Sequence, residues 1–89
     1  MHNDDETLLQ FPCEFPIKAM GKAEEGFAQL VLEIVRRHAP DTGELNVKTK
    51  PSNNGTYVSV TIVVVATSKA QLDNIYLEMT SHPAILMAF

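Results

Sequence analysis

The sequence predicts an α+β domain in which four antiparallel strands are covered on one face by two helices. The first observation behind this is a long β-branched run over residues 56–66, which is typical of a strand inside a sheet. The second is a helical period of apolar residues on both sides of that run. The third is a turn at residues 51–55 that predicts a hairpin. Together they predict the order β-α-β-β-α-β, the split βαβ arrangement.

The first strand is expected over residues 14–20, where apolar and polar side chains alternate until Gly21 ends it. Pro16 has no N–H donor, so its end of the strand should be unpaired or at an edge. Residues 23–38 follow as a helix, because one apolar stripe recurs at helical spacing: Phe27, Leu30, Val31, Ile34 and Val35.

The charges near the ends of this helix suit its dipole, with Glu24 and Glu25 expected in the first turn and basic residues in the last. Gly26 weakens a helix by about 1 kcal/mol relative to alanine, so we expect it to allow a close approach of helix and sheet. Pro40 ends the helix.

The second strand is expected over residues 44–50, with Leu45, Val47 and Thr49 on one face. The third strand has a wholly apolar face that should meet the helices: Val58, Val60, Ile62, Val64 and Ala66. Its opposite face begins polar and becomes apolar, so it should be half exposed.

Ser68 and Gln71 form a capping-box pattern that predicts the start of the second helix. Residues 84–89 complete the sheet as a short strand. The predicted fold is ferredoxin-like, with strand order 4-1-3-2 and both helices on one face.

The 89 residues are enough for one domain, expected over residues 8–89 after a disordered acidic arm at residues 1–7. Leu8, Leu9 and Phe11 should pack on the domain. The net charge of -4 argues against a nucleic-acid partner. The single cysteine, Cys13, excludes an intramolecular disulfide and suits a reducing compartment. No long apolar run or export signal is present, so we expect a cytoplasmic protein without a membrane partner.

No pattern in the sequence indicates a metal, a cofactor or catalysis. His2, His38 and His82 fall on the arm, a helix end and a loop, and share no ligand spacing with Cys13. Cys13 is interpreted as a small, partly buried apolar residue and His38 as a cap on helix carbonyls, with a switch or general base as the alternative. No nucleophile–base or acid–base pair is visible, so we expect no enzyme. Lys18, Lys48 and Lys50 are either a small basic patch on the open sheet face or separate solvated lysines.

Two functional classes that share this topology lack their residues here. Acylphosphatases grip phosphate with an arginine in the loop after the first strand, but residues 20–23 contain none. RNA-recognition motifs stack bases on aromatic side chains of the open sheet face, where the third strand offers only Tyr57.

Several short motifs, taken in order, resemble the YbeD-like family of small proteobacterial proteins of unknown function. The resemblance covers residues 8–89, and these motifs carry it: Phe11-Pro12, Phe15-Pro16, Lys18-Ala19-Met20-Gly21, Arg37-His38-Ala39-Pro40, Lys50-Pro51-Ser52-Asn53-Asn54-Gly55 and Tyr57-Val58-Ser59-Val60-Thr61. It implies a ferredoxin-like fold similar to ACT domains, the regulatory modules that bind amino acids, and a role linked to lipoate metabolism.

The ACT likeness implies a candidate ligand loop after the first strand, at Gly21 and Lys22. A helix N-terminus beside a lysine can hold a carboxylate, although the charges of Glu24 and Glu25 would repel it. A small-metabolite module using this loop is therefore the alternative function.

The preferred function is a small non-catalytic regulatory or protein-interaction domain with an unknown protein partner. The loop over residues 50–55 is longer than a hairpin needs, which favours a contact surface formed by a few side chains: Lys48, Lys50, Ser52, Asn54 and Tyr57. Apolar residues on the open sheet face, namely Met20, Val63 and Val65, also predict at least a weak homodimer.

Overall fold

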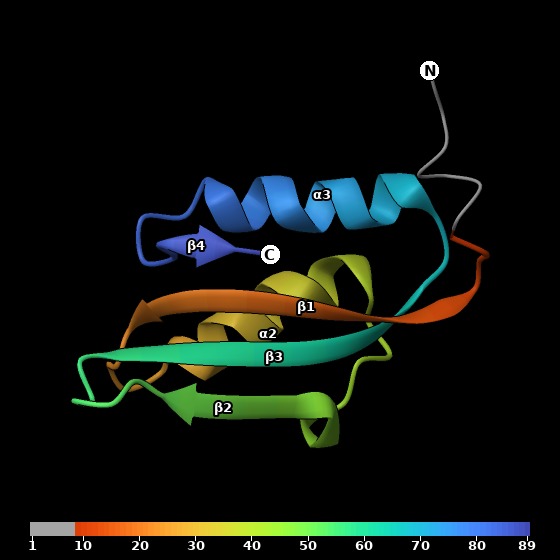
Figure 1. Ribbon diagram of the computed structural model, residues 1–89. Coiled ribbons are helices and arrows are strands. Elements are labelled where there is room, and N and C mark those ends of the chain that lie inside the picture. Colours follow the sequence, from red (N-terminus) through yellow and green to blue (C-terminus); the bar gives the residue numbers. More distant parts are fainter. Residues whose placement is uncertain (1–8) are drawn as a thin grey trace.

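The computed structural model describes residues 9–89, which form one sheet and two helices (Figure 1). Along the chain the elements are β1 (Cys13–Lys22), α2 (Phe27–His38), the short 3-10 helix η1 (Glu44–Asn46), β2 (Val47–Pro51), β3 (Tyr57–Ala66), α3 (Lys69–Thr80) and β4 (Met87–Ala88).

The sheet has the order β2-β3-β1-β4, and all its neighbouring strands are antiparallel. Read from the other edge, this order is β4-β1-β3-β2. β3 pairs with β1 along its whole length, from Tyr57 to Ala66, but with β2 only from Val58 to Ile62. The long β-branched strand is therefore central, and the α+β arrangement fits a ferredoxin-like fold.

The core lies between one face of the sheet and the two helices, which leave the face in view in Figure 1 uncovered. Val60, Ile62 and Val64 of β3 are at most 1% exposed, and Val31, Ile34 and Val35 of α2 are fully buried. From α3, Leu72, Ile75 and Met79 complete the core. The predicted apolar faces of the third strand and of both helices are therefore confirmed.

Pro16 lies on an unpaired side of β1, as its missing N–H donor predicts. Lys18 exchanges two backbone hydrogen bonds with Phe89, at 2.7 and 2.8 Å, so its N–H and C=O point toward β4. Backbone N–H and C=O groups alternate in direction along a strand, so the nitrogen of Pro16 also points toward the β4 side of β1. β4 pairs only with Ala19 and Met20, so it does not extend as far as Pro16.

The boundary between β1 and α2 differs from the prediction. β1 continues through Gly21 to Lys22, and α2 begins at Phe27, so Glu24 and Glu25 precede the helix and do not lie in its first turn. Gly26 caps the helix with φ of 88°, a left-handed conformation that favours glycine. An added Cβ at Gly26 would meet nothing within 4 Å, so the expected close approach is not there.

The close approach occurs at Gly21 instead. A Cβ at this buried position would lie 2.6 Å from the carbonyl oxygen of Ala84 and would also meet the ring of Phe27. Gly21 is thus required by packing between β1, α2 and the segment before β4.

The second and last strands are shorter than predicted. Residues Glu44–Asn46 form η1, and Leu45 is 97% exposed, so it does not lie in the strand on one face with Val47 and Thr49 as expected. The backbone N–H of Asn46 bonds to the carbonyl of Gly43 at 3.1 Å, which turns the chain before it can enter the sheet. At the other end, Ile85 is buried but lies in the turn before β4.

Leu9 and Phe11 pack against the core, as expected of the lead-in to the first strand. Leu8 and the arm predicted at residues 1–7 lie outside the described residues.

Candidate functional site

The register of the sheet gathers lysines on its open face. Lys48 lies opposite Thr61, and Thr61 lies opposite Lys18 on its other side, so the two lysines flank one β3 residue. Lys50 pairs with Ser59 in the next row, and Lys22 pairs with Tyr57. We call Lys18, Lys22, Lys48 and Lys50 the lysine face; it holds four of the seven basic residues of an acidic chain.

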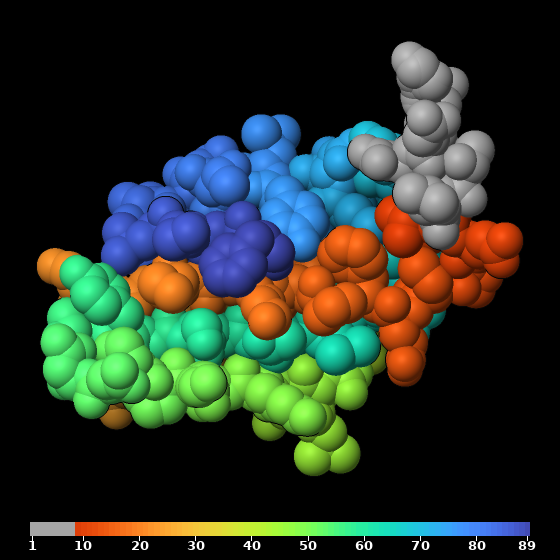
Figure 2. All heavy atoms as spheres, viewed as in Figure 1, coloured from red at the N-terminus to blue at the C-terminus, as the bar shows by residue number. Residues whose placement is uncertain are grey.

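The charge of the lysine face is not compensated locally. None of its four lysines forms an ion pair within residues 9–89, whereas Arg37 and Lys69 each pair with a carboxylate on α3. The strand residues that share this face include one acid, Glu14, which lies far along β1 opposite Val65. Figure 2 shows the side chains of β1, β3 and β2 forming one face with no helix over it. The sequence left two interpretations of Lys18, Lys48 and Lys50, a small basic patch or separate solvated lysines. This placement favours the basic patch.

The hairpin loop beside the lysine face uses its polar side chains to hold its own shape. The Ser52 hydroxyl accepts the N–H of Tyr57 at 3.0 Å, and the Asn54 side-chain oxygen accepts the N–H of Thr56 at 3.1 Å. Ser52 also donates its hydroxyl hydrogen to Asn54 at 3.1 Å. Of the predicted contact residues, Lys48, Lys50 and Tyr57 therefore face outward, while Ser52 and Asn54 shape the turn.

The structure separates the two residues of the candidate ligand loop. Gly21 is buried within β1, and Lys22 is exposed on the lysine face. A cavity of about 330 Å³ does lie beside the start of α2, but neither residue lines it. The one ionisable side chain in its lining is Glu24, whose charge would oppose a bound carboxylate.

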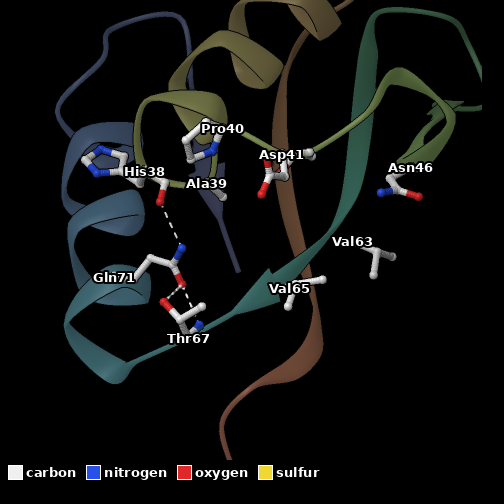
Figure 3. A pocket seen from close by; sticks show the side chains of 10 residues that line it. His38, Ala39, Pro40, Asp41, Asn46, Val63, Val65, Thr67 and Gln71 are labelled. Atoms are coloured by element: carbon white, nitrogen blue, oxygen red, sulfur yellow. Dashed lines mark hydrogen bonds between the residues drawn. The ribbon is translucent and has the colours of Figure 1, made fainter.

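A second cavity of about 330 Å³ lies where the end of β3 meets the segment that leaves α2 (Figure 3). We call it the corner cavity. Its apolar side is formed by Val63 and Val65 of β3, with Ala39 and Pro40 across from them. Its polar side chains come from four segments of the chain: Asp41, Thr42, Asn46, Thr67 and Gln71.

Hydrogen bonds tie the walls of the corner cavity together. Gln71 donates its side-chain N–H to the carbonyl of His38 at 2.8 Å, and its side-chain oxygen accepts the N–H of Thr67 at 2.8 Å. Ser68 caps α3 by accepting the N–H of Gln71 at 3.0 Å, as the capping-box pattern predicts. Arg36 fixes the next segment through a 2.8 Å bond from its Nε to the carbonyl of Thr42.

His38 does not cap helix carbonyls as predicted, because its ring reaches Glu78 on α3. The His38 Nε2 and Glu78 Oε1 atoms are 2.8 Å apart, and Arg37 binds the other oxygen of the same carboxylate. These residues are 40 positions apart, so no local pattern indicates the pair. No hydroxyl or thiol group in the described residues hydrogen-bonds to the His38 ring, so the contact joins two helices and lacks a nucleophile.

The remaining candidate ligands lie apart. Cys13 is half-buried against the core, and the His82 Nδ1 atom accepts the N–H of Ala84 at 3.1 Å within its own turn. Over residues 9–89, no three histidine, cysteine or acidic side chains are grouped closely enough to hold a metal ion. No helix in this part of the chain is long and apolar enough to cross a membrane.

Comparison with known proteins places this arrangement in a family. Residues 6–89 match the model of the protein family of unknown function DUF493. A UPF0250 protein of Nitrosomonas europaea is 45% identical over 83 residues, covering 93% of this chain and 95% of that protein. One from Chromobacterium violaceum is 44% identical and covers 98% of both chains.

A solved structure shares the fold at low sequence identity. The solution structure of a protein from H. pylori superposes with a TM-score of 0.70 and 11% identity, covering 100% of this chain and 94% of that one. The match to the family model over nearly the whole chain, with these relatives, confirms the YbeD-like resemblance. The chain belongs to the DUF493/UPF0250 family of small proteobacterial proteins of unknown function.

Proposed function

We propose that this protein is a small non-catalytic interaction domain whose lysine face binds an acidic surface of a partner protein. The observation that carries the proposal is that four lysines of a chain with net charge -4 gather on one open sheet face and form no ion pair within residues 9–89. Complementary charge speeds the encounter of two proteins and disfavours wrong partners.

Apolar groups beside the lysines suit a protein partner better than a free anion. Tyr57 is 39% exposed, Met87 is 54% exposed, and a hollow of about 110 Å³ lies between Met20, Lys50 and Tyr57. Aromatic and methionine side chains are enriched at the centres of interfaces, while charged residues lie at their rims. The lysine face therefore combines a steering charge with groups that a protein surface can bury.

A finer version of this function is a ferredoxin-like, ACT-like regulatory domain in the cytoplasm, linked to lipoate metabolism. Its support is the YbeD-like resemblance together with the strand order and the helices on one face. The alternative, metabolite binding at Gly21 and Lys22, gains no support from the geometry, because Gly21 packs inside the sheet and Glu24 lines the adjacent cavity.

The proposal is tested by removing the lysine charges without changing the fold. A triple variant, Lys18→Gln, Lys48→Gln and Lys50→Gln, removes three positive charges from exposed positions. A matched control adds three negative charges to exposed helix residues through Gln29→Glu, Ala70→Glu and Asn74→Glu, giving the same net charge. The tagged wild type and both variants are used to capture proteins from an extract of a bacterium that carries the protein, and the captured partner is then purified and titrated directly.

We expect the lysine variant to lose the partner and the control to retain it. Binding of wild type should also weaken as salt rises, because exposed charges are screened over about 10 Å at 0.1 M salt. Equal binding by both variants would contradict the proposal. So would equal losses, which would show that net charge matters and the face does not.

A further inference from the structure

We propose that the corner cavity, with the free edge of β3 beside it, binds a short extended peptide that carries a basic side chain. The peptide would add to β3 as a strand. This inference goes beyond the lysine face, because it concerns the opposite end of β3 and a ligand of opposite charge.

The free edge follows from the register and the direction of the backbone groups. Tyr57 accepts the N–H of Ser52 at 2.8 Å and donates its own N–H to the Ser52 hydroxyl, so its backbone groups point to the β2 side. Alternation along β3 directs the N–H and C=O of Val65 to that side too. Pairing with β2 ends at Val47 and Ile62, so no strand in residues 9–89 reaches the Val65 groups.

A peptide strand could use this edge, since unpaired backbone groups at a sheet edge are a template for another strand. The residue opposite Val65 would exchange two hydrogen bonds with it. The residue opposite Val64 would point to the helix side of the sheet, where Val64 itself is buried. That is the side of the segment that follows α2, so this peptide side chain would enter the corner cavity.

One residue that lines the cavity has a buried hydroxyl without a hydrogen-bond partner among residues 9–89. Thr42 is the one buried polar residue among residues 9–89, at 6% exposure, and it lines the cavity. Its backbone groups bond to Ala39 and Arg36, but its hydroxyl forms no hydrogen bond with any other part of residues 9–89. A buried hydroxyl without a partner is costly, and an incoming donor would relieve that cost.

The charges around the cavity select a basic side chain. Asp41 lines the cavity and is exposed, and it forms no ion pair within the described residues. Figure 3 shows its carboxylate pointing toward Val65, with Asn46 on the far side beside Val63.

The positive groups nearby are already engaged. Arg36 directs its Nε to the Thr42 carbonyl, and His38, which also lines the cavity, has its ring held by Glu78. The same bonds, with the Gln71 bridge, hold the walls in place before any ligand arrives. Preorganised walls reduce the entropy lost on binding.

The test titrates isotope-labelled protein with a capped pentapeptide, Thr-Val-Lys-Val-Thr, followed by NMR. We expect shifts at the amides of Asp41, Thr42, Val65 and Thr67, and slower hydrogen exchange at the Val65 amide. A control peptide with glutamate in place of lysine should bind about tenfold more weakly or worse, because it places a negative charge near Asp41.

Three variants separate the backbone, charge and hydroxyl contributions. Val65→Pro removes the N–H donor at a locally unpaired position, and Val65→Thr is its matched control that keeps the donor. Asp41→Asn removes the charge while retaining the shape, and Thr42→Val removes the hydroxyl. We expect Val65→Pro and Asp41→Asn each to weaken binding by about tenfold, Thr42→Val to weaken it less, and Val65→Thr to bind as wild type.

Three results would overturn the proposal. One is the absence of peptide binding at millimolar concentration, or shifts confined to the lysine face. Another is unchanged affinity in a folded Val65→Pro variant, which would exclude strand addition. The third is binding of free lysine amide as tightly as the peptide, which would indicate a small-amine site.

Discussion

At the scale of single residues, Gly21 and Gly26 have roles other than those expected of them. Gly26 provides a left-handed helix cap with open space around it, and Gly21 provides the close approach between sheet, helix and the segment before β4. A glycine's role thus depends on what lies near its missing Cβ. That neighbourhood is made by residues such as Ala84, which is distant in sequence from Gly21.

The first prediction concerns Gly21. Gly21→Ala should destabilise the protein by about 1–3 kcal/mol, because the new Cβ would overlap a backbone carbonyl and an aromatic ring that can move little. Chemical denaturation measures the effect. Gly43→Ala is the control, since a Cβ there meets nothing within 4 Å and the backbone has φ of -96°. An equally stable Gly21→Ala protein would mean that this position is not required for packing.

At the scale of elements, α2 buries more than its predicted stripe, and α3 places a tyrosine at the edge of the core. Leu32 of α2 is only 3% exposed, although it lies outside the stripe that begins at Phe27. Tyr76 of α3 is half-buried at the border of the core, where its apolar ring packs against buried residues. Burial there raises the pKa of the Tyr76 phenol above its usual value of 10.0, because the ionised form is less well solvated.

The second prediction concerns this raised pKa. The unfolded chain releases the Tyr76 proton near pH 10, but the folded chain holds it to a higher pH. The stability linked to this group should therefore be fully present below pH 10 and should decrease as the pH rises through the folded pKa. Denaturation midpoints measured from pH 8 to 11 check it against Tyr76→Phe. A parallel pH profile in that variant would contradict the prediction.

At the scale of the whole molecule, charge is distributed unevenly. The lysine face concentrates positive charge on the open side of the sheet, whereas the acidic residues Asp73 and Glu78 lie on helix α3, outside this face. The outer strand β2 also carries Lys48 and Lys50 at its unpaired edge. Two copies joined there by antiparallel pairing would place like charges near one another, which is a common device against edge-to-edge association.

The third prediction concerns self-association. We expect at least a weak homodimer, because apolar side chains such as Val65 and Met87 are more than half exposed. If the open faces of two copies meet, their lysines repel, so the dimer should strengthen as salt rises. Partner binding should show the opposite dependence. Sedimentation from low to 1 M salt measures this, and a monomer at high protein concentration in every condition would contradict it.

Local sequence was sufficient for the features that arise within a few neighbouring residues. The β-branched run predicted β3, the residues of the turn predicted the hairpin, and Ser68 with Gln71 predicted the start of α3. Each depends on backbone preferences and on hydrogen bonds that span only a few positions. The same reasoning failed at Leu45, because the hydrogen bond from the N–H of Asn46 to the carbonyl of Gly43 closes a turn of 3-10 helix where a strand was expected.

Only the tertiary structure decided the candidate sites. The corner cavity needs β3, the segment after α2 and the start of α3 to meet, and its Gln71 bridge reaches a carbonyl 33 residues away. The lysine face likewise needs the pairing register of three strands to place Lys18 and Lys48 on either side of Thr61. Such contacts depend on how burial of the whole core sets the register, and no local pattern encodes them.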